Sequence, residues 1–267
     1  MRLVVVGSAG SFPAPDSAAS CYLVQAEGPD GAGGTRTWNV LLDLGNGALG
    51  PLQRHIAPAA LDAVAISHLH ADHVADVVVL GVMLRYDPRG LRPDPLPLYG
   101  PEGVHERLAQ LSGHDPATST AAHLALGTWR AGEPVRVGPL TIEPVPVLHP
   151  VPAFGFRVTG PSETDPGRPV TLAYTGDTDE CAGLDDLARG ADLLLAEAAY
   201  LETTPGAARG VHLTGRRAAE AAQRGGSRRL LLTHLVAWND PAESLAEARG
   251  AYDGPVDLAR PGMVVAL

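Results

Sequence analysis

The stretch His68-Leu69-His70-Ala71-Asp72-His73 decides how this sequence is interpreted. It places three imidazoles and one carboxylate within a single turn of chain. An apolar, strand-like run precedes it at Ala63–Ile66, and a hydrophobic segment that favours a buried helix follows at Val74–Leu80. Neutral nitrogen and anionic oxygen donors at this density suit Zn²⁺ or a similar divalent metal. The stretch therefore predicts a metal site at the junction of a strand and a helix.

The order of the four donors predicts how they divide between two metal ions. In an extended segment, residues two apart point the same way, so we expect His68 and His70 to share one metal. Asp72 and His73 come after the chain turns, and we expect them to face a second metal nearby. A solvated, His-rich loop is the alternative, and it is disfavoured because the rest of the chain supplies the missing ligands.

Composition bounds the class of protein. The chain has 267 residues, of which 45% are hydrophobic and 19% charged, which is typical of a globular protein that can fold as one domain over residues 1–267. No apolar run approaches the about 18 residues needed to cross a bilayer. The opening Met1–Gly7 favours a first strand over a signal peptide. Cys21 and Cys181 form no disulfide framework, so we expect a cytoplasmic protein.

The charge of the chain argues against a nucleic-acid partner. The net charge is -10, whereas a nucleic-acid-binding face is usually basic. All basic residues are arginines, and the absence of lysine excludes Schiff-base chemistry and a lysine-dependent phosphate loop.

Short strand-like runs alternate with helical segments along the chain. The expected strands are Leu3–Val6, Ser20–Gln25, Asn39–Leu42, Ala63–Ser67, Leu96–Tyr99, Leu140–Val147, Phe154–Val158, Val170–Tyr174, Asp192–Ala196, Leu230–Thr233 and Met263–Ala266. The expected helices are Gly47–His55, Val74–Arg85, Val104–Gln110, Ala182–Arg189, Thr214–Gln223 and Pro241–Tyr252. This order suits two sheets packed face to face with helices outside.

Turn and cap residues refine this assignment. Thr214 and Asp240 are expected to be N-caps, and Gly225 is expected to end the helix that Thr214 begins. The Gly- and Pro-rich stretches Glu27–Thr37 and Gly160–Pro169 indicate exposed hairpin loops rather than domain linkers.

Three further donors each follow an apolar strand. His149 follows Leu140–Leu148, Asp177 follows the strand that ends near Thr175, and His234 follows Leu230–Thr233. Donors at strand ends tend to gather on one rim of a layered fold. Each is a weak signal alone, but with the first stretch they make a set of seven ligands.

In its order and spacing, this set resembles that of the metallo-β-lactamase superfamily. The resemblance covers nearly the whole chain and implies an α+β fold, a four-layer αββα sandwich of two mixed sheets with helices outside. It also implies a two-metal site, with one metal held by His68, His70 and His149, the other by Asp72, His73 and His234, and Asp177 bridging them. Zn²⁺ is the expected ion, and Mn²⁺ or Fe²⁺ also suit these donors. Two such metals can share a hydroxide for hydrolysis.

Glu197 and His212 narrow the chemistry. They resemble the pair of the phosphodiesterase branch that includes tRNase Z, in which a glutamate orients a histidine that protonates the leaving oxygen. The resemblance makes Glu197 and His212 catalytic, together with Asp72. The alternatives are a surface carboxylate for Glu197 and an exposed histidine near a helix N-terminus for His212.

The substrate is expected to be small. We find no Gly-rich basic arm of the kind that tRNA-processing enzymes carry. The arginines at 216, 217, 224, 228 and 229 favour a solvated helix face over an RNA-binding patch. The segments Gly7–Ser11, Pro15–Ser20, Ser67–Asp72, Tyr174–Thr178 and Leu231–His234 resemble those of atypical bacterial cyclic nucleotide phosphodiesterases. That resemblance implies hydrolysis of 3′,5′-cyclic AMP to 5′-AMP by a small-molecule enzyme without a membrane partner, and a homodimer.

Four minor assignments stay open. The loop Gly7–Ser11 either approaches a phosphate with its N–H groups or is an ordinary turn. Thr178 either supports a ligand or caps locally, and Arg85 and Tyr86 either line the pocket or lie on plain surface. Three other functions remain possible: an RNA 3′-end endonuclease like tRNase Z, an ester or lactone hydrolase at the same metals, and a ligand-binding regulator without turnover.

Overall fold

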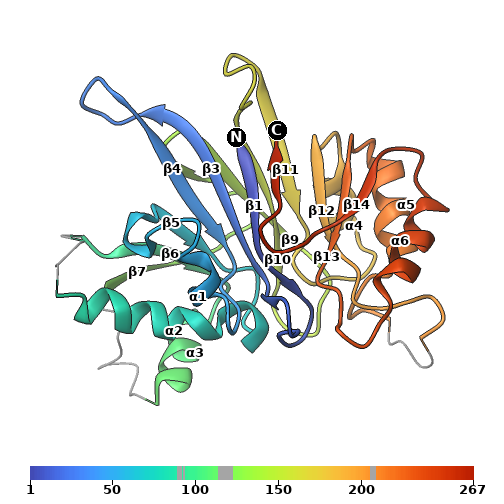
Figure 1. Cartoon of the computed structure of the whole chain (residues 1–267), viewed down its shortest axis with the longest axis horizontal. Coiled ribbons are helices and arrows are strands. Elements are labelled where there is room, and N and C mark those ends of the chain that lie inside the picture. Colours follow the sequence, from blue (N-terminus) through green and yellow to red (C-terminus); the bar gives the residue numbers. More distant parts are fainter. Residues whose placement is uncertain (89–91, 93, 114–122, 205–208) are drawn as a thin grey trace.

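The computed structural model describes residues 1–88, 92, 94–113, 123–204 and 209–267, and its centre is a pair of β-sheets (Figure 1). The first sheet has the order β15-β1-β3-β4-β5-β6-β7, with β2 paired to β1, and the second has the order β14-β13-β12-β11-β10-β9-β8. The strands of the first sheet are β1 (Arg2–Ala9), β2 (Ala18–Ala19), β3 (Cys21–Pro29), β4 (Thr35–Leu42), β5 (Ala63–Ala65), β6 (Leu96–Gly100), β7 (Leu124–Thr128) and β15 (Val264–Ala266). Those of the second are β8 (Val135–Val137), β9 (Leu140–Pro146), β10 (Phe154–Pro161), β11 (Pro169–Tyr174), β12 (Leu193–Glu197), β13 (Leu230–Thr233) and β14 (Val256–Leu258).

Helices lie outside both sheets (Figure 1). The first sheet is accompanied by α1 (Leu49–Leu52), a 3₁₀ turn (Pro58–Ala60), α2 (Ala71–Tyr86) and α3 (Val104–Ser112). The second sheet is accompanied by α4 (Ala182–Ala188), α5 (Gly215–Gly225) and α6 (Pro241–Arg249). None of these helices, within the part of the chain that the structure describes, is long and apolar enough to traverse a bilayer.

The alternation of apolar residues along the strands produces three hydrophobic cores. On β1, Leu3 and Val5 enter the core between the two sheets, while Val4 and Val6 enter the core beneath α2 and α3. A third core joins the outer face of the second sheet to α4, α5 and α6. Because a strand directs successive side chains to opposite faces, one apolar strand can serve both cores. The expected αββα sandwich is confirmed.

Several expected boundaries are wrong. The stretch Glu27–Thr37 is mostly strand, because β3 and β4 continue as an antiparallel ribbon to the pair Pro29 and Thr35. The expected helix Gly47–His55 is reduced to the four residues of α1. The sequence patterns missed β2, β7, β8 and β14, which are short or glycine-containing strands.

Both predicted N-caps are confirmed. The Thr214 hydroxyl accepts the Arg217 N–H at 3.2 Å, and the Asp240 carboxylate accepts the Ala242 N–H at 2.9 Å. The predicted stop of α5 is wrong by one residue. Gly226, not Gly225, takes the left-handed conformation (φ 65°) that ends the helix and that glycine adopts without a steric penalty.

The helix that follows the histidine stretch begins earlier than predicted. We expected it from Val74, but α2 begins at Ala71, so that Asp72 and His73 lie in its first turn. The loop before α1 packs closely on this turn, since the Leu44 N–H donates to the His73 carbonyl at 2.9 Å. A side chain at Gly45 would collide with the carbonyl of Asp72, which explains the glycine there.

Candidate metal centre

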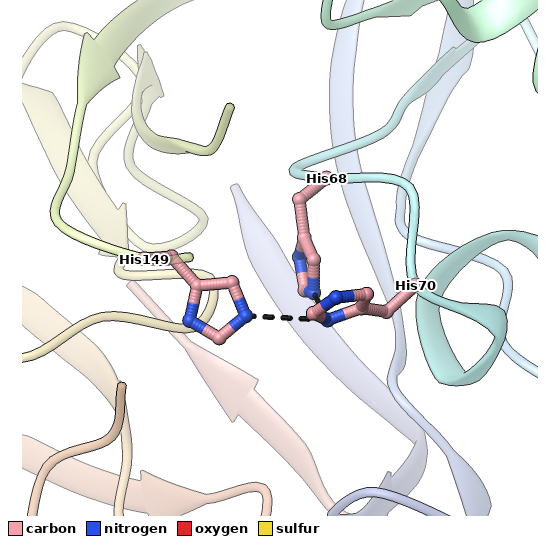
Figure 2. A group of neighbouring side chains, drawn as sticks. All are labelled: His68, His70 and His149. Atoms are coloured by element: carbon pink, nitrogen blue, oxygen red, sulfur yellow. Dashed lines mark hydrogen bonds between the residues drawn. The ribbon is translucent and has the colours of Figure 1, made fainter. Parts of the chain in front are cut away.

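Three histidines from two distant segments converge on one point. Nδ1 of His70 lies 3.0 Å from Nε2 of His68 and 3.2 Å from Nε2 of His149. Figure 2 shows the three rings turned toward one another, with His149 arriving from the side opposite to His68 and His70. The three nitrogens lie close enough to bind one metal ion. We call this group the imidazole half of the centre.

Neighbouring groups fix the orientation and the charge of these rings. Nδ1 of His149 donates to the Val211 carbonyl at 2.9 Å, which leaves the lone pair of Nε2 to face the other two rings. Nδ1 of His68 lies 3.1 Å from the Ser67 hydroxyl. Burial lowers the pKa of His68, His70 and His149, so all three are neutral near pH 7, as metal ligands must be.

A second group contains Asp72, His73, Asp177 and His234, and all four side chains are buried. Nε2 of His234 lies 3.1 Å from Oδ2 of Asp72 and 3.3 Å from Nε2 of His73. Nε2 of His73 lies 3.2 Å from Oδ1 of Asp177. We call this group the carboxylate half, because two of its four members are carboxylates.

Asp177 lies between the two halves. Its Oδ2 is 3.7 Å from Nε2 of His68 on one side and 3.4 Å from Nε2 of His234 on the other. Burial alone would raise the pKa of Asp177, but the surrounding imidazoles of His234, His73 and His68 hold it well below its usual range. Its buried Oδ1 faces Nε2 of His73 without a well-aligned hydrogen bond. An ionised carboxylate in this position can contact a cation on each side.

Asp43 supports both halves, and our reading of the sequence missed it. Its Oδ2 lies 2.7 Å from Nδ1 of His73 and accepts hydrogen bonds at 2.7 Å from the hydroxyls of Ser67 and Tyr174. Through Ser67 it also reaches His68. A carboxylate behind a ligating imidazole fixes its orientation and raises its basicity. Asp43 follows β4 directly, which is the same strand-end signal that identified His149, Asp177 and His234.

The two halves differ in how they hold protons. Burial opposes a charge on His73, yet Asp177 and Asp43 raise its pKa well above the usual value. Burial likewise opposes a charge on Asp72, but hydrogen bonds with His234 and His73 lower its pKa. In the metal-free chain the carboxylate half therefore holds a proton that the imidazole half does not. A divalent cation would displace that proton.

Glu197 and His212 meet beside this centre. Nδ1 of His212 donates to Oε1 of Glu197 at 2.9 Å, and it lies 3.9 Å from Oδ2 of Asp177. The ring centroid of His212 is 5.4 Å from that of His149 and 5.5 Å from that of His234, so His212 borders both halves. The carboxylate of Glu197 is fully buried at the end of β12. A plain surface role for Glu197 is excluded by this burial.

Backbone groups lock the Glu197 carboxylate in place. The Thr178 N–H donates to Oε1 and the Ala199 N–H donates to Oε2, each at 3.0 Å. Burial lowers the pKa of His212, but Glu197 and Asp177 outweigh it and raise that pKa to about 9. The Thr178 hydroxyl accepts the Leu148 N–H at 3.1 Å and donates to the Asp179 carbonyl at 2.8 Å. Thr178 therefore supports Glu197 through its main chain and holds the residue before the ligand His149 through its side chain.

Two of the open assignments are decided in favour of the plainer alternative. In the loop Gly7–Ser11 the Ser8 and Gly10 N–H groups are already bonded, to Ser17 and to the Leu235 carbonyl, so the ordinary-turn interpretation is favoured. Arg85 and Tyr86 end α2, and at 1.5 Å per residue they lie about 20 Å along the helix from Asp72. They cannot line a pocket at these ligands.

The arginine cluster is mostly paired with acidic groups. Arg217 lies 3.2 Å from Asp179 and 3.3 Å from Glu202, Arg224 bonds Asp185, and Arg228 lies 3.7 Å from Asp192. Arg229 donates to the carbonyl of Ala266. These contacts favour the solvated helix face over an RNA-binding patch.

The donors present fit two divalent cations. Imidazole nitrogens face one another in the imidazole half, and imidazole nitrogens face carboxylate oxygens in the carboxylate half. There, the buried Oδ1 of Asp177 has no well-aligned hydrogen-bond donor. Imidazole and carboxylate ligands suit Zn²⁺, Mn²⁺ and Fe²⁺. Among the histidines that the structure describes, His55, His105 and His123 join neither half. His114 lies outside the described residues.

Comparison with known proteins identifies the class. Residues 38–235 match the family described as "Beta-lactamase superfamily domain", so the chain belongs to this superfamily. An uncharacterized protein of Mycobacterium tuberculosis, Rv1339, is 39% identical over 258 residues, which cover 96% of this chain and 88% of that protein. Ribonuclease Z of Myxococcus xanthus is 29% identical over 274 residues, which cover 85% of this chain and 88% of that protein.

A solved structure agrees with this assignment. The crystal structure of the metallo-β-lactamase fold protein YhfI from Bacillus subtilis superposes with a TM-score of 0.83 at 28% identity, and it covers 100% of this chain and 99% of that one. YhfI is itself described as a "probable metallo-hydrolase". The family, the fold and the His/Asp centre together make this chain a metal-dependent hydrolase.

Proposed function

We propose that the chain hydrolyses 3′,5′-cyclic nucleotides, with cyclic AMP giving 5′-AMP, at a centre of two divalent metal ions, most suitably Zn²⁺. The Glu197–His212 pair beside the two halves carries this proposal. The 3′-oxygen of a ribose leaves poorly unless it is protonated, and a histidine held by a carboxylate can supply that proton. The pair therefore favours phosphodiesters whose leaving group is a ribose 3′-oxygen, and the charge of the chain favours a small one among them.

In the proposed centre each residue has one role. His68, His70 and His149 would hold one ion, Asp72, His73 and His234 would hold the other, and Asp177 would serve both. When bound, the ions would supply a hydroxide nucleophile near neutral pH and stabilise charge on the phosphoryl oxygens. Asp72 is also held beside His234 and His73, and the hydrogen bonds with them lower its pKa against the effect of burial, so it adds negative charge to the carboxylate half.

His212 serves as the general acid. Its Nδ1–H is engaged by Glu197, so Nε2 is the atom that carries the transferred proton. Its raised pKa, about 9 without metal, favours the protonated form at neutral pH, and bound cations lower that value. Glu197 cannot rotate away, because two backbone N–H groups hold its oxygens.

A small substrate is favoured over RNA by charge. The chain carries a net charge of -10, and its arginine cluster is largely paired with acidic side chains. An RNA substrate would need uncompensated basic surface for its many phosphates. A cyclic nucleotide has a single phosphate, whose charge two bound metal ions would neutralise.

RNA 3′-end cleavage is the second candidate, and the likeness to Ribonuclease Z favours it. It uses the same bond chemistry, so the substrate alone separates the two proposals. Ester or lactone hydrolysis would leave the buried Glu197–His212 pair without a use. We also propose that the chain works in the cytoplasm, where its two free cysteines stay reduced, and that it forms a homodimer.

A substrate panel tests the proposal. Zinc-loaded protein is incubated with 3′,5′-cyclic AMP, 3′,5′-cyclic GMP, 2′,3′-cyclic AMP, precursor tRNA and p-nitrophenyl acetate, with Asp177→Asn as the inactive control. We expect 5′-AMP from 3′,5′-cyclic AMP. Cleavage of only the precursor tRNA would replace our proposal with the second candidate. Cleavage of only the carboxylic ester would contradict both.

A further inference from the structure

Two aromatic side chains, Phe12 and Trp238, pack together on segments that adjoin the metal ligand His234. The ring centroids of Phe12 and Trp238 are 4.9 Å apart with a tilt of 43°, and Trp238 is 75% exposed. The other two tryptophans are covered: Trp129 is buried, and the Arg36 guanidinium lies 3.6 Å from the Trp38 ring centroid. Trp238 is therefore supported by a second ring and still open to solvent.

Both rings belong to segments fastened to the metal ligand His234. The Ser11 N–H points at Nε2 of His234 across 3.3 Å, and Phe12 is the next residue, about 3.8 Å further between Cα atoms. Trp238 lies in the turn that follows His234, which the Asn239 N–H closes on the Val236 carbonyl at 2.9 Å. Both segments that carry the pair are therefore anchored next to the carboxylate half.

The turn that contains Trp238 is also hydrogen-bonded to the segment that holds Glu197, the partner of His212. The side-chain amide of Asn239 donates to the Ala199 carbonyl at 2.9 Å, and the Ala199 N–H holds Glu197. The turn that carries Trp238 is thus tied to both the metal ligand His234 and the residue that holds Glu197.

Backbone strain shows that this region is built rather than loose. Ser11 (φ 62°) and His234 (φ 55°) both occupy the left-handed region that non-glycine residues avoid. A side chain at Gly10 would approach within 2.3 Å of the His234 carbonyl oxygen. Such conformations persist only where surrounding contacts over-determine them, and they cluster at functional sites.

We propose that Phe12 and Trp238 form a platform on which the nucleobase of the substrate stacks while its phosphate lies at the metal ions. This inference rests on the proposed function. A nucleotide has one charged group, the phosphate, and one flat aromatic group, the base. The metal centre suits the phosphate, and the aromatic pair suits the base. Stacking accepts any base, because every base has a π-face. The platform therefore supplies affinity for a nucleoside over a plain phosphodiester, with little choice among bases.

The test compares Trp238→Ala with Tyr86→Ala. Tyr86 is 66% exposed but lies at the far end of α2, so its loss controls for removal of a surface ring. With cyclic AMP, we expect Trp238→Ala to raise KM roughly 5- to 100-fold with little change in kcat. Trp238→Phe should recover most of the loss. Zinc content should stay that of the unchanged chain. Phe12→Ala provides a second variant with a smaller expected effect, should Trp238→Ala fold poorly.

A binding measurement separates failure of the platform from failure of the proposed function. Tryptophan fluorescence of the zinc-loaded chain is titrated with 5′-AMP and, separately, with ribose 5-phosphate, which has no base. We expect quenching by 5′-AMP only, and none with Trp238→Phe. Unchanged KM in Trp238→Ala, or equal effects of the two ligands, would overturn the platform. Quenching by 5′-AMP without hydrolysis of any cyclic nucleotide would uphold the platform and reject the proposed reaction.

Discussion

In the candidate metal centre, the half formed by His68, His70 and His149 contains only imidazoles, whereas the half that includes Asp72 and His73 is rich in carboxylates. The imidazole half is neutral, because burial lowers the pKa of all three histidines. In the carboxylate half, negative charge raises the pKa of His73 and keeps a proton in place when no cation is bound.

This difference means that one centre can contain two sites of unequal charge and unequal metal affinity. Attraction between a cation and a carboxylate is large where water is excluded, so we expect the carboxylate half to bind the first ion. The imidazole half would then fill second and gain from Asp177, which the two halves share. Four changes test whether the two halves differ in this way.

Asp177→Asn should have the largest effect, because it removes the one charge that both halves contact. We expect both ions to be lost and kcat/KM with cyclic AMP to fall about 10³-fold or more, since bound metal supplies several kcal/mol of transition-state stabilisation. Zinc content by elemental analysis and kinetics measure this. Asp186→Asn, at an exposed carboxylate paired with Arg189, is the control. Loss of a single ion would mean that Asp177 belongs to one half only.

His212→Asn should separate proton transfer from metal binding. We expect kcat with cyclic AMP to fall roughly 10²- to 10⁴-fold while zinc content stays constant, because His212 protonates the leaving oxygen and holds no ion. Bis(4-nitrophenyl) phosphate, whose leaving group departs without a proton, should lose much less activity. His55→Asn, at an exposed histidine, is the control. Equal losses with both substrates would remove the general-acid role.

Asp43→Asn should weaken mainly the carboxylate half. Asparagine tolerates the left-handed backbone of residue 43 (φ 57°), but its amide supports His73 less well than the carboxylate does. We expect zinc affinity there to fall about 10- to 100-fold. Competition with a chelator measures it, and Asp62→Asn, which alters a carboxylate bonded to Arg36 and the Asn39 N–H, is the control. An unchanged affinity would refute the supporting role.

Lowering the pH should weaken zinc binding in the carboxylate half more than in the imidazole half. A raised pKa means that His73 is protonated at neutral pH without metal, so zinc must displace one proton, and affinity falls about tenfold for each pH unit lost. The lowered pKa values of the imidazole half leave its three histidines mostly neutral near pH 7, so zinc has little proton to displace there. Calorimetry in two buffers of different ionisation enthalpy counts the released protons. Equal proton release from the two sites would contradict the contrast.

Much of this centre could be predicted because its ligands either cluster in the sequence or directly follow apolar strands. The histidine stretch and the donors after strands identified seven side chains that the structure brings together. Asp43 carried the same strand-end signal but was missed, since a single buried aspartate looks like many others. The Val211 carbonyl could not be predicted, because every residue has a carbonyl and only the fold selects which one meets His149.

The fold was predictable to a similar degree. Apolar alternation indicated two sheets with outer helices, and that architecture is confirmed. The strands that were missed have weak local patterns: β7 contains Gly127, β14 has three residues, and the ribbon of β3 and β4 runs through Gly28 and Pro29. Pairing with a neighbouring strand, not local propensity, fixes such segments.

Stepwise loading with zinc tests the two-site centre most directly. Metal-free chain receives zinc in small increments, and cyclic AMP hydrolysis is measured at each ratio of zinc to protein. We predict little activity up to one ion per chain, when the carboxylate half fills, and full activity only at two. Full activity at one ion per chain would contradict the two-metal account.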